Sequence, residues 1–272
     1  MQYIKVIFKN SAGEVADMLI ALLSDAGFNG FEETENDLFA YIGETEFSPG
    51  ILETIAGGLG VSYETEIIAP QNWNALWESN FQPVIVAGVC TIRAHFHDIE
   101  VSTPYEIVIT PKMSFGTGHH ATTQQMILQM KDMELSGRSV LDFGTGTGVL
   151  AILAEKLGAA KVLAIDNDIW SIENAAENII RNSCKNISVQ QGSLEDIAPG
   201  KFDVILANIN RHILLQYMTD LYSRLNSGGT ILMSGLLMED KDIICTAASG
   251  VGFLFKHMTE QNNWISLLFQ KI

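Results

Sequence analysis

This 272-residue sequence shows no cysteine pattern typical of disulfide bonds, no membrane span and no secretory signal. The three cysteines, Cys90, Cys184 and Cys245, lie far apart and form no CxxC pair, which indicates reduced thiols in a cytoplasmic protein. No apolar run reaches the roughly 18 residues that a membrane span requires. The N-terminus also lacks the charged, apolar and small-residue pattern of a secretory signal. The sequence therefore predicts a cytoplasmic protein that does not enter a membrane.

Basic residues are also scarce, since 16 Lys and Arg face 32 Asp and Glu, a formal net charge of −16. Residues 1–70 contain only Lys5 and Lys9 against twelve acidic residues. A surface of this sign repels phosphate groups, so we expect no direct nucleic-acid binding, and it attracts a basic partner. The composition leaves open the alternative that the acidity only keeps the protein soluble.

The first 69 residues have the pattern of a small α+β domain. Strands are expected at 2–9, 28–34, 37–43 and 61–68, and helices at 11–26 and 49–57. Ser11 is the expected N-cap of the first helix, with Glu14 three residues later. The order βαββαβ predicts a ferredoxin-like unit without an obvious pocket, whose expected task is to hold a partner.

Residues 70–84 form the expected linker. Trp73 and Trp77 stand four positions apart on a predicted short helix that Pro83 ends, and this spacing indicates contacts with a neighbouring domain rather than with a ligand. Residues 85–272 form the expected second domain. It opens with strands at 84–96 and 105–110, and from about residue 120 helices and strands alternate, which predicts a parallel sheet with helices on both faces.

A glycine-rich turn follows an expected strand of this second domain. After Asp142, the glycines Gly144, Gly146 and Gly148 form a GxGxG pattern before a helix begins. Glycine permits the sharp turn and lets a ligand approach the backbone, and the amides at the helix start face that ligand. Asp166 ends the next expected strand, where its carboxylate can accept hydrogen bonds from two ribose hydroxyls. The combination predicts a nucleoside cofactor.

The spacing of the glycines favours one nucleoside over another. The dinucleotide pattern GxGxxG requires a third glycine at the position of Val149. Asp142 suits a ligand with a positively charged amino group and a sulfonium better than one with a pyrophosphate. We therefore expect S-adenosylmethionine, and an NAD-dependent oxidoreductase is the disfavoured alternative.

The DxGxGxG loop, the acid after the next strand and a closing hairpin at 252–270 together resemble the class I methyltransferase fold. This resemblance implies a Rossmann-like, seven-stranded α/β sheet in the order 3-2-1-4-5-7-6, with the cofactor over the carboxyl ends of its strands. Asn208 ends the expected fourth strand, which faces the transferred methyl in this fold. The sequence there is ANIN rather than the Asn-Pro-Pro-Tyr of relatives that modify adenine or glutamine. A flexible alkyl amine therefore fits better as the acceptor.

The stretch FGTGHHATT at 115–123, with ANI downstream and the tryptophan-rich linker upstream, resembles the family of ribosomal protein L11 methyltransferases (PrmA). The resemblance spans nearly the whole chain, although His119 and Ala121 depart from the usual residues. It makes this stretch a gate over the cofactor rather than a second binding loop. His119 and His120 are expected to pack the loop or contact the cofactor, because no third ligand lies at metal spacing.

The glycine loop, the fold and the family resemblance, which contributes Thr123, Gly144, Asp166 and Asn208, together predict the residues of the site. Asn208 is the expected catalytic residue, and no metal is expected. The expected cofactor-binding residues are Phe115, Thr123, Asp142, Gly144, Gly146, Asp166, Ser193 and Asn208.

The implied reaction is methylation of amino groups of ribosomal protein L11, at lysine side chains and the N-terminal amine, to trimethylation. The acidic residues 1–69 would hold this basic protein, and the enzyme is expected to be a monomer. Two alternatives remain open. One is an S-adenosylmethionine-dependent N-methyltransferase that acts on another protein or a small molecule, and the other is a catalytically silent cofactor-binding module.

Overall fold

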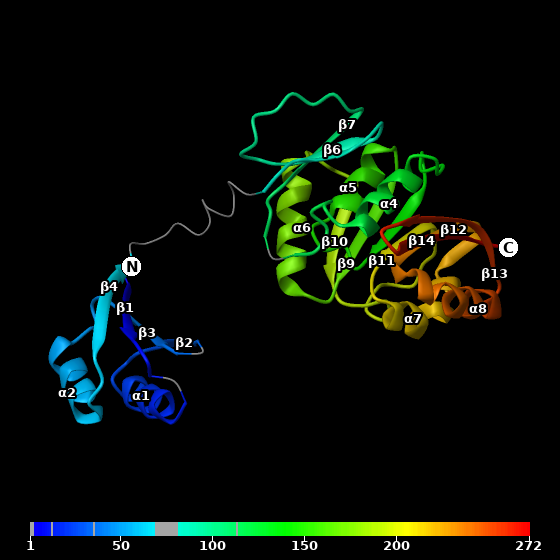
Figure 1. The fold of residues 1–272 in the computed structure, drawn as a ribbon. Coiled ribbons are helices and arrows are strands. Elements are labelled where there is room, and N and C mark those ends of the chain that lie inside the picture. Colours follow the sequence, from blue (N-terminus) through cyan, green and yellow to red (C-terminus); the bar gives the residue numbers. More distant parts are fainter. Residues whose placement is uncertain (1–2, 12, 35, 69–80, 113) are drawn as a thin grey trace. The chain divides into compact units, whose positions relative to one another are not determined.

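The computed structural model describes residues 3–11, 13–34, 36–68, 81–112 and 114–272. The chain forms two compact units, residues 1–80 and 81–272, each of which is described by itself (Figure 1). Trp73, Trp77 and most of the expected linker 70–84 lie outside the described residues.

The first unit is a four-stranded antiparallel sheet with two helices on one face (Figure 1). Its strand order is β2-β3-β1-β4. The elements are β1 (Tyr3–Phe8), α1 (Glu14–Asp25), β2 (Gly30–Glu33), β3 (Leu38–Gly43), α2 (Pro49–Leu59) and β4 (Tyr63–Ile68). Alternate residues of β1 are buried, and Val6 and Phe8 pack with Leu19, Leu23 and Leu38 in a core of their own.

The expected N-cap of the first helix is wrong. Helix α1 begins at Glu14, and its N-cap is Gly13, which has no side chain to accept a hydrogen bond. Ser11 is buried instead, and its hydroxyl donates to the carbonyl oxygen of Lys9 at 3.2 Å. The hydroxyl is therefore engaged with the preceding strand, which the capping pattern in the sequence does not reveal.

The second unit is built on a seven-stranded sheet in the order β10-β9-β8-β11-β12-β14-β13. All pairings are parallel except those that β14 makes with β12 and β13. Its strands are β8 (Ser139–Phe143), β9 (Lys161–Asp166), β10 (Ile187–Gln191), β11 (Phe202–Asn208), β12 (Leu225–Leu237), β13 (Phe253–Gln261) and β14 (Trp264–Lys271). Asn262 and Asn263, with φ of 53° and 65°, form the tight turn between the last two strands.

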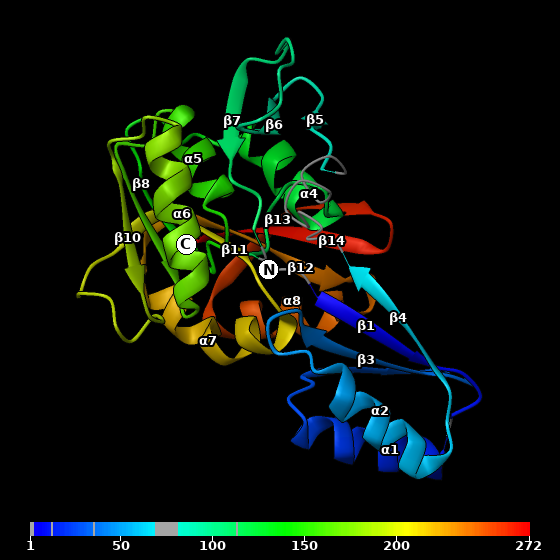
Figure 2. The same cartoon turned by 90° about the vertical axis from the view of Figure 1, so that its left-hand side faces the viewer.

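Helices cover both faces of this sheet (Figure 2). One core lies against α4, α5 and α6, and the other against α7 and α8. The helices are α4 (Ala121–Met130), α5 (Val149–Lys156), α6 (Ile169–Arg181), α7 (Arg211–Ser223) and α8 (Lys241–Val251), which the 3-10 turn Met238–Asp240 precedes. Within β8, Val140 belongs to the first core and Leu141 to the second, as the alternation of a strand requires. Among the helices that the structure describes, none is both long and apolar enough to cross a membrane.

A three-stranded sheet of β5 (Val84–Val86), β6 (Cys90–Ala94) and β7 (Tyr105–Ile109) packs onto the core of α4, α5 and α6. The expected single strand 84–96 is therefore wrong. A turn at 87–89 interrupts it, and Gly88 adopts a φ of 72° there. Strands β5 and β6 form an antiparallel hairpin, and β7 runs parallel to β6.

Candidate functional site

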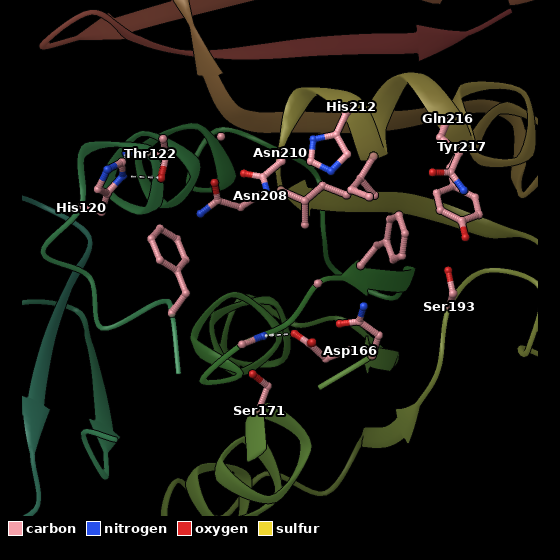
Figure 3. Close-up of a pocket in the computed structure, with 18 of the residues that line it drawn as sticks. His120, Thr122, Asp166, Ser171, Ser193, Asn208, Asn210, His212, Gln216 and Tyr217 are labelled. Atoms are coloured by element: carbon pink, nitrogen blue, oxygen red, sulfur yellow. Dashed lines mark hydrogen bonds between the residues drawn. The ribbon is translucent and has the colours of Figure 1, made fainter. Parts of the chain in front are cut away.

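A cavity of about 730 Å³ opens in the second unit at the carboxyl ends of the central strands (Figure 3). Phe143 ends β8, Asp166 ends β9 and Asn208 ends β11, and all three line it. The chain crosses to opposite sides of the sheet from the adjacent strands β8 and β11, so the cavity lies at the topological switch point where α/β sheets bind their ligands.

Six of the eight expected site residues line this cavity. They are Phe115, Gly144, Gly146, Asp166, Ser193 and Asn208. The other two, Thr123 and Asp142, are buried close to it but do not line it.

The glycine loop has the conformation that its sequence predicts. Gly144 and Gly146 have φ of 77° and 54°, a region that L-residues with side chains rarely adopt. A Cβ atom on Gly144 would overlap the side chain of Ile209, and one on Gly146 would overlap the carbonyl oxygen of Phe115. Glycine is therefore required at both positions by the backbone conformation and by close packing against Ile209 and Phe115, and both glycines line the cavity.

Asp166 both shapes this loop and faces the cavity. Its Oδ2 accepts a hydrogen bond from the backbone N–H of Gly146 at 2.9 Å, and its Oδ1 accepts one from that of Asp168 at 3.1 Å. Each carboxylate oxygen has a further lone pair, so the same side chain can still accept hydrogen bonds from a ligand. The two roles are compatible because the backbone donors hold the carboxylate in one orientation (Figure 3).

Asp142 lies beneath the loop, so a direct contact with the cofactor does not follow from its position. Its side chain is 1% exposed, and its Oδ2 accepts a hydrogen bond from the hydroxyl of Thr145 at 2.6 Å. Burial raises the pKa of this carboxyl group from 3.8 to about 7, against the lowering effect of the Thr145 hydroxyl. Asp142 thus holds the loop that follows β8 rather than lining the cavity.

The two glycine-rich stretches of the sequence lie side by side. The backbone N–H of Thr147 donates to the carbonyl oxygen of Phe115 at 2.9 Å, and the Thr147 hydroxyl donates to that of Gly116 at 2.7 Å. The backbone at 115–116 is therefore joined to the glycine loop. The Phe115 side chain stays free of this attachment, since the residue is 53% exposed and its ring faces the cavity. Its expected action as a gate stays a prediction.

Three aromatic rings in contact with one another line the cavity. The ring of His120 makes edge-to-face contacts with Phe115, at 5.4 Å between centroids, and with Trp264, at 4.7 Å. His120 is the N-cap of α4, and its Nδ1 accepts a hydrogen bond from the N–H of Thr122. His119 does not line the cavity; its ring packs against Phe81 at 4.9 Å.

Asn208 lines the cavity, and one polar atom of its side chain has no protein partner within the part of the chain that the structure describes. Its Nδ2 donates to the hydroxyl oxygen of Thr123 at 3.3 Å, which connects the buried Thr123 to a residue that lines the cavity. Its Oδ1 is buried and has no hydrogen-bond partner among the described residues. A buried acceptor of this kind costs free energy unless a ligand completes it.

The sequence analysis did not identify the contribution of α7 or of Trp264. Asn210, His212, Gln216 and Tyr217 line the side of the cavity opposite Asp166 (Figure 3). The spacing of His212 and Gln216, i and i+4 just after Asn208, is a signal that could have placed them on one helix face. Trp264 carries no comparable signal, because only the pairing of β14 with β12 brings it to the cavity.

These residues fit S-adenosylmethionine. Among the lining residues that the structure describes, Asp166 alone is an Asp, Glu, Lys or Arg. A cavity whose formal charge is negative favours a cationic sulfonium ligand over a diphosphate. The Asp166 carboxylate offers the hydrogen-bond acceptors that the ribose of an adenosine needs, and the glycine loop lines the cavity beside it.

The chain matches the family described as ribosomal protein L11 methyltransferase (PrmA) over residues 26–272. The ribosomal protein L11 methyltransferase of Porphyromonas gingivalis is 44% identical over 260 residues, which cover 93% of this chain and 90% of the relative. That of Phocaeicola vulgatus is 39% identical over 278 positions and 99% of both chains. A crystal structure of a ribosomal protein L11 methylase from Lactobacillus delbrueckii subsp. bulgaricus superimposes with a TM-score of 0.66 and 32% identity, over 71% of this chain and 100% of that chain.

Proposed function

Because the chain belongs to the family of ribosomal protein L11 methyltransferases, we propose that it methylates ribosomal protein L11 with S-adenosylmethionine as the methyl donor. The observation that supports this proposal most directly is the cavity itself. It combines one carboxylate, Asp166, with three contacting aromatic rings and the unpaired Oδ1 of Asn208.

The acceptors in this proposal are amino groups, at lysine side chains and the N-terminal amine of L11, up to the trimethylated state. Methyl transfer needs the lone pair of a neutral amine, yet only roughly 0.1% of free lysine is neutral at pH 7.4. The aromatic rings of Phe115, His120 and Trp264 would remove water from the amine and so lower the pKa of its ammonium form. A separate general base is then not required.

Asn208 is the proposed catalytic residue. Its buried Oδ1 would accept a hydrogen bond from an amine N–H and thereby turn the nitrogen lone pair towards the methyl group. Thr123 would hold the Asn208 amide in this orientation through the hydrogen bond at 3.3 Å. The remaining contribution is alignment of the amine with the transferred carbon, which lowers the entropic part of the barrier.

The other residues would bind the donor, which supplies the methyl group as part of a sulfonium. Asp166 would accept hydrogen bonds from the ribose hydroxyls, and Gly144 and Gly146 would let the donor approach the loop. Ser193 would lie near the adenine, and Phe115 would form a wall beside the methionine end. Asp142 would act on the loop and not on the ligand.

The two parts of the chain would divide the work. Residues 1–69, a ferredoxin-like unit, would hold the basic L11 protein, and residues 85–272, with a seven-stranded sheet, would carry out methyl transfer. The linker 70–84 would let several amines reach one donor. The strand order of the first unit and its excess of acidic residues support this assignment. We expect a cytoplasmic monomer without nucleic-acid binding.

Mass spectrometry of L11 after incubation with the enzyme and S-adenosylmethionine tests the proposal. We expect the mass of L11 to rise by one to three methyl groups per modified amine, at lysines and at the N-terminus. L11 that stays unmodified while a metabolite panel becomes methylated would point to the small-molecule alternative. No turnover on either would point to a silent binding module.

A further inference from the structure

Helix α6 carries two asparagines on one face, and a third is its C-cap; all three lie outside the cavity described above. Asn174, Asn178 and Asn182 follow one another at intervals of four residues, and Asn174 and Asn178 are fully buried. Asparagine is a poor helix former in helix interiors, because its side chain competes for backbone hydrogen bonds. Asparagines repeated along a buried face therefore indicate that their side-chain amides form hydrogen bonds that offset the low helix propensity.

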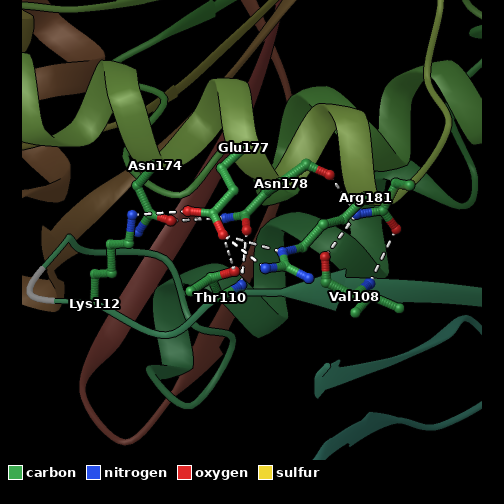
Figure 4. A network of polar contacts seen from close by, with 8 residues as sticks. Val108, Thr110, Lys112, Asn174, Glu177, Asn178 and Arg181 are labelled. Carbon is green, nitrogen blue, oxygen red and sulfur yellow. Dashed lines mark hydrogen bonds and ion pairs between the residues drawn. The ribbon is translucent and has the colours of Figure 1, made fainter. Parts of the chain in front are cut away.

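The last of them, Asn182, forms hydrogen bonds with the backbone of strand β7 as a neighbouring strand would. Its Oδ1 accepts from the N–H of Val108 at 2.9 Å, and its Nδ2 donates to the carbonyl oxygen of the same residue at 2.6 Å. Val108 lies in β7, the edge strand of the three-stranded sheet. The side-chain amide thus satisfies both backbone groups of this residue, as a backbone peptide would (Figure 4).

Asn178 joins two segments that are far apart in the sequence. Its Oδ1 accepts from the N–H of Thr110 at 2.7 Å, directly after β7. Its Nδ2 donates to the carbonyl oxygen of Thr147 at 2.8 Å, within the glycine loop, and to Asn174 at 3.2 Å. A single buried amide therefore contacts both the start of the segment that leads to Phe115 and the loop at the cavity.

The far end of that segment is attached to the same loop residue. Thr147 donates from its N–H to Phe115 and from its hydroxyl to Gly116. Thr110 is consequently held by Asn178, and residues 115–116 are held by Thr147. Thr147 in turn bonds to Asn178, so the contacts form a closed ring.

A cluster of charges surrounds the first attachment. Glu177 accepts hydrogen bonds from the hydroxyl of Thr110 at 2.8 Å, from Lys112 at 2.7 Å and from Arg181 at 2.8 Å (Figure 4). Lys112, followed by Arg181, lowers the pKa of the Glu177 carboxyl from 4.5 to about 2. Glu177 is therefore ionised at neutral pH, and it adds an ion pair with Lys112 and a hydrogen bond from Thr110 to the attachment that Asn178 makes.

From this geometry we infer that Asn178 is a positioning residue for methyl transfer, whose amide joins Thr110 to the glycine loop that also holds residues 115–116, so that Phe115 stands at the cofactor cavity. The role of Asn178 in methyl transfer rests on the proposed function. The effect of an Asn178 substitution on cofactor affinity requires only that the protein binds S-adenosylmethionine.

The test is Asn178→Asp, which keeps an acceptor for Thr110 but removes the donor to the Thr147 carbonyl and places a carboxylate beside it. The matched control is Asn182→Asp, the same change one helical turn later, at a residue that does not contact the glycine loop. For Asn178→Asp we expect the Kd for S-adenosylmethionine, measured by calorimetry, to rise about tenfold. For Asn182→Asp we expect it to stay within about twofold.

Hydrogen exchange and kinetics separate positioning from a general loss of stability. In Asn178→Asp the N–H of Thr147 should exchange faster, and the KM for S-adenosylmethionine should rise more than the KM for L11. If both variants lower Tm equally and change the Kd equally, Asn178 is only structural and the inference fails.

Asn178→Ala provides a second test if Asn178→Asp does not fold. Alanine removes both the acceptor for Thr110 and the donor to the Thr147 carbonyl without adding a charge. We expect the same rise in the Kd, and an unchanged Kd would overturn the inference. If the wild-type enzyme binds S-adenosylmethionine but leaves L11 unmodified, the proposed function is refuted. The binding measurements on the variants do not depend on that result.

Discussion

At the scale of single residues, two aspartates that look equivalent in the sequence have different tasks. Both Asp142 and Asp166 stand at the carboxyl ends of adjacent strands, and both are expected cofactor contacts. Only Asp166 lines the cavity. Asp142 is two residues from Val140 in β8, so it points to the same face of the sheet and is covered by the loop that follows. The loop above Asp142 therefore decides which of the two acids faces the cavity.

Replacing Asp166 with Ala should weaken binding of S-adenosylmethionine by about 1–3 kcal/mol, the range for losing hydrogen bonds to a charged group. The loop should also loosen, because Gly146 and Asp168 lose their acceptor. Calorimetric titration measures the change, with Asp220→Ala as a control at an exposed carboxylate outside the cavity. Equal affinities of the two variants would remove Asp166 from the cofactor site.

At the scale of elements, the junction of β8 with α5 depends on a buried acid. The Asp142 carboxylate accepts a hydrogen bond from the hydroxyl of Thr145. The loop that follows contains Gly144, Gly146 and Gly148, whose positive φ values glycine adopts most easily. The stretch at 115–116 then bonds to Thr147. Two glycine-rich segments that the sequence keeps apart thus form one structural unit, in which one segment shapes the cavity and the other presents Phe115.

The pKa of Asp142 predicts a pH dependence of stability. Because the folded-state pKa is raised from 3.8 to about 7, the folded protein retains a proton that the unfolded chain releases. The contribution of this group therefore falls as pH rises from about 4 to 7 and is constant above pH 7.

The Asp142→Asn variant should not show the decrease in the free energy of unfolding that titration of Asp142 causes between about pH 4 and pH 7. Between pH 5 and pH 8, the free energy of unfolding of the variant should improve relative to wild type by on the order of 2 kcal/mol. Urea unfolding at a series of pH values measures the difference. Parallel profiles for the two proteins would show that Asp142 does not titrate in this range.

At the scale of the whole molecule, the chain consists of two units with separate cores. All residues that line the cavity belong to the second unit. The excess of acidic residues is concentrated in the first, where residues 1–70 hold two of the 16 basic residues. The cavity and the excess of acidic residues therefore belong to different units of the chain.

Deleting residues 1–70 should abolish methylation of L11 and leave affinity for S-adenosylmethionine nearly unchanged. The cavity keeps every lining residue in the shortened chain, whereas the acidic unit that we expect to hold the substrate is lost. Methyl transfer to L11 and calorimetric titration of the cofactor measure the two effects. Unaltered activity towards L11 would refute the assignment of the first unit as the substrate-binding domain.

The sequence by itself determined the features that depend on neighbouring residues. The alternation of strands and helices from residue 120, the GxGxG turn and the position of Asp166 all follow from local spacing. Gly144 and Gly146 were identifiable because a turn of this shape needs φ values above zero, whatever surrounds it. The family resemblance at 115–123 then indicated the reaction class.

Only the tertiary structure decided which side chains share the cavity. Trp264 comes to His120 through the pairing of β14 with β12, and α7 brings His212 and Tyr217 to the opposite side. Burial of Asp142 and the amide of Asn178 likewise depend on packing between distant segments. Periodicity encodes contacts within a few residues, whereas a cavity is formed where strand order and helix packing bring together parts of the chain that lie far apart.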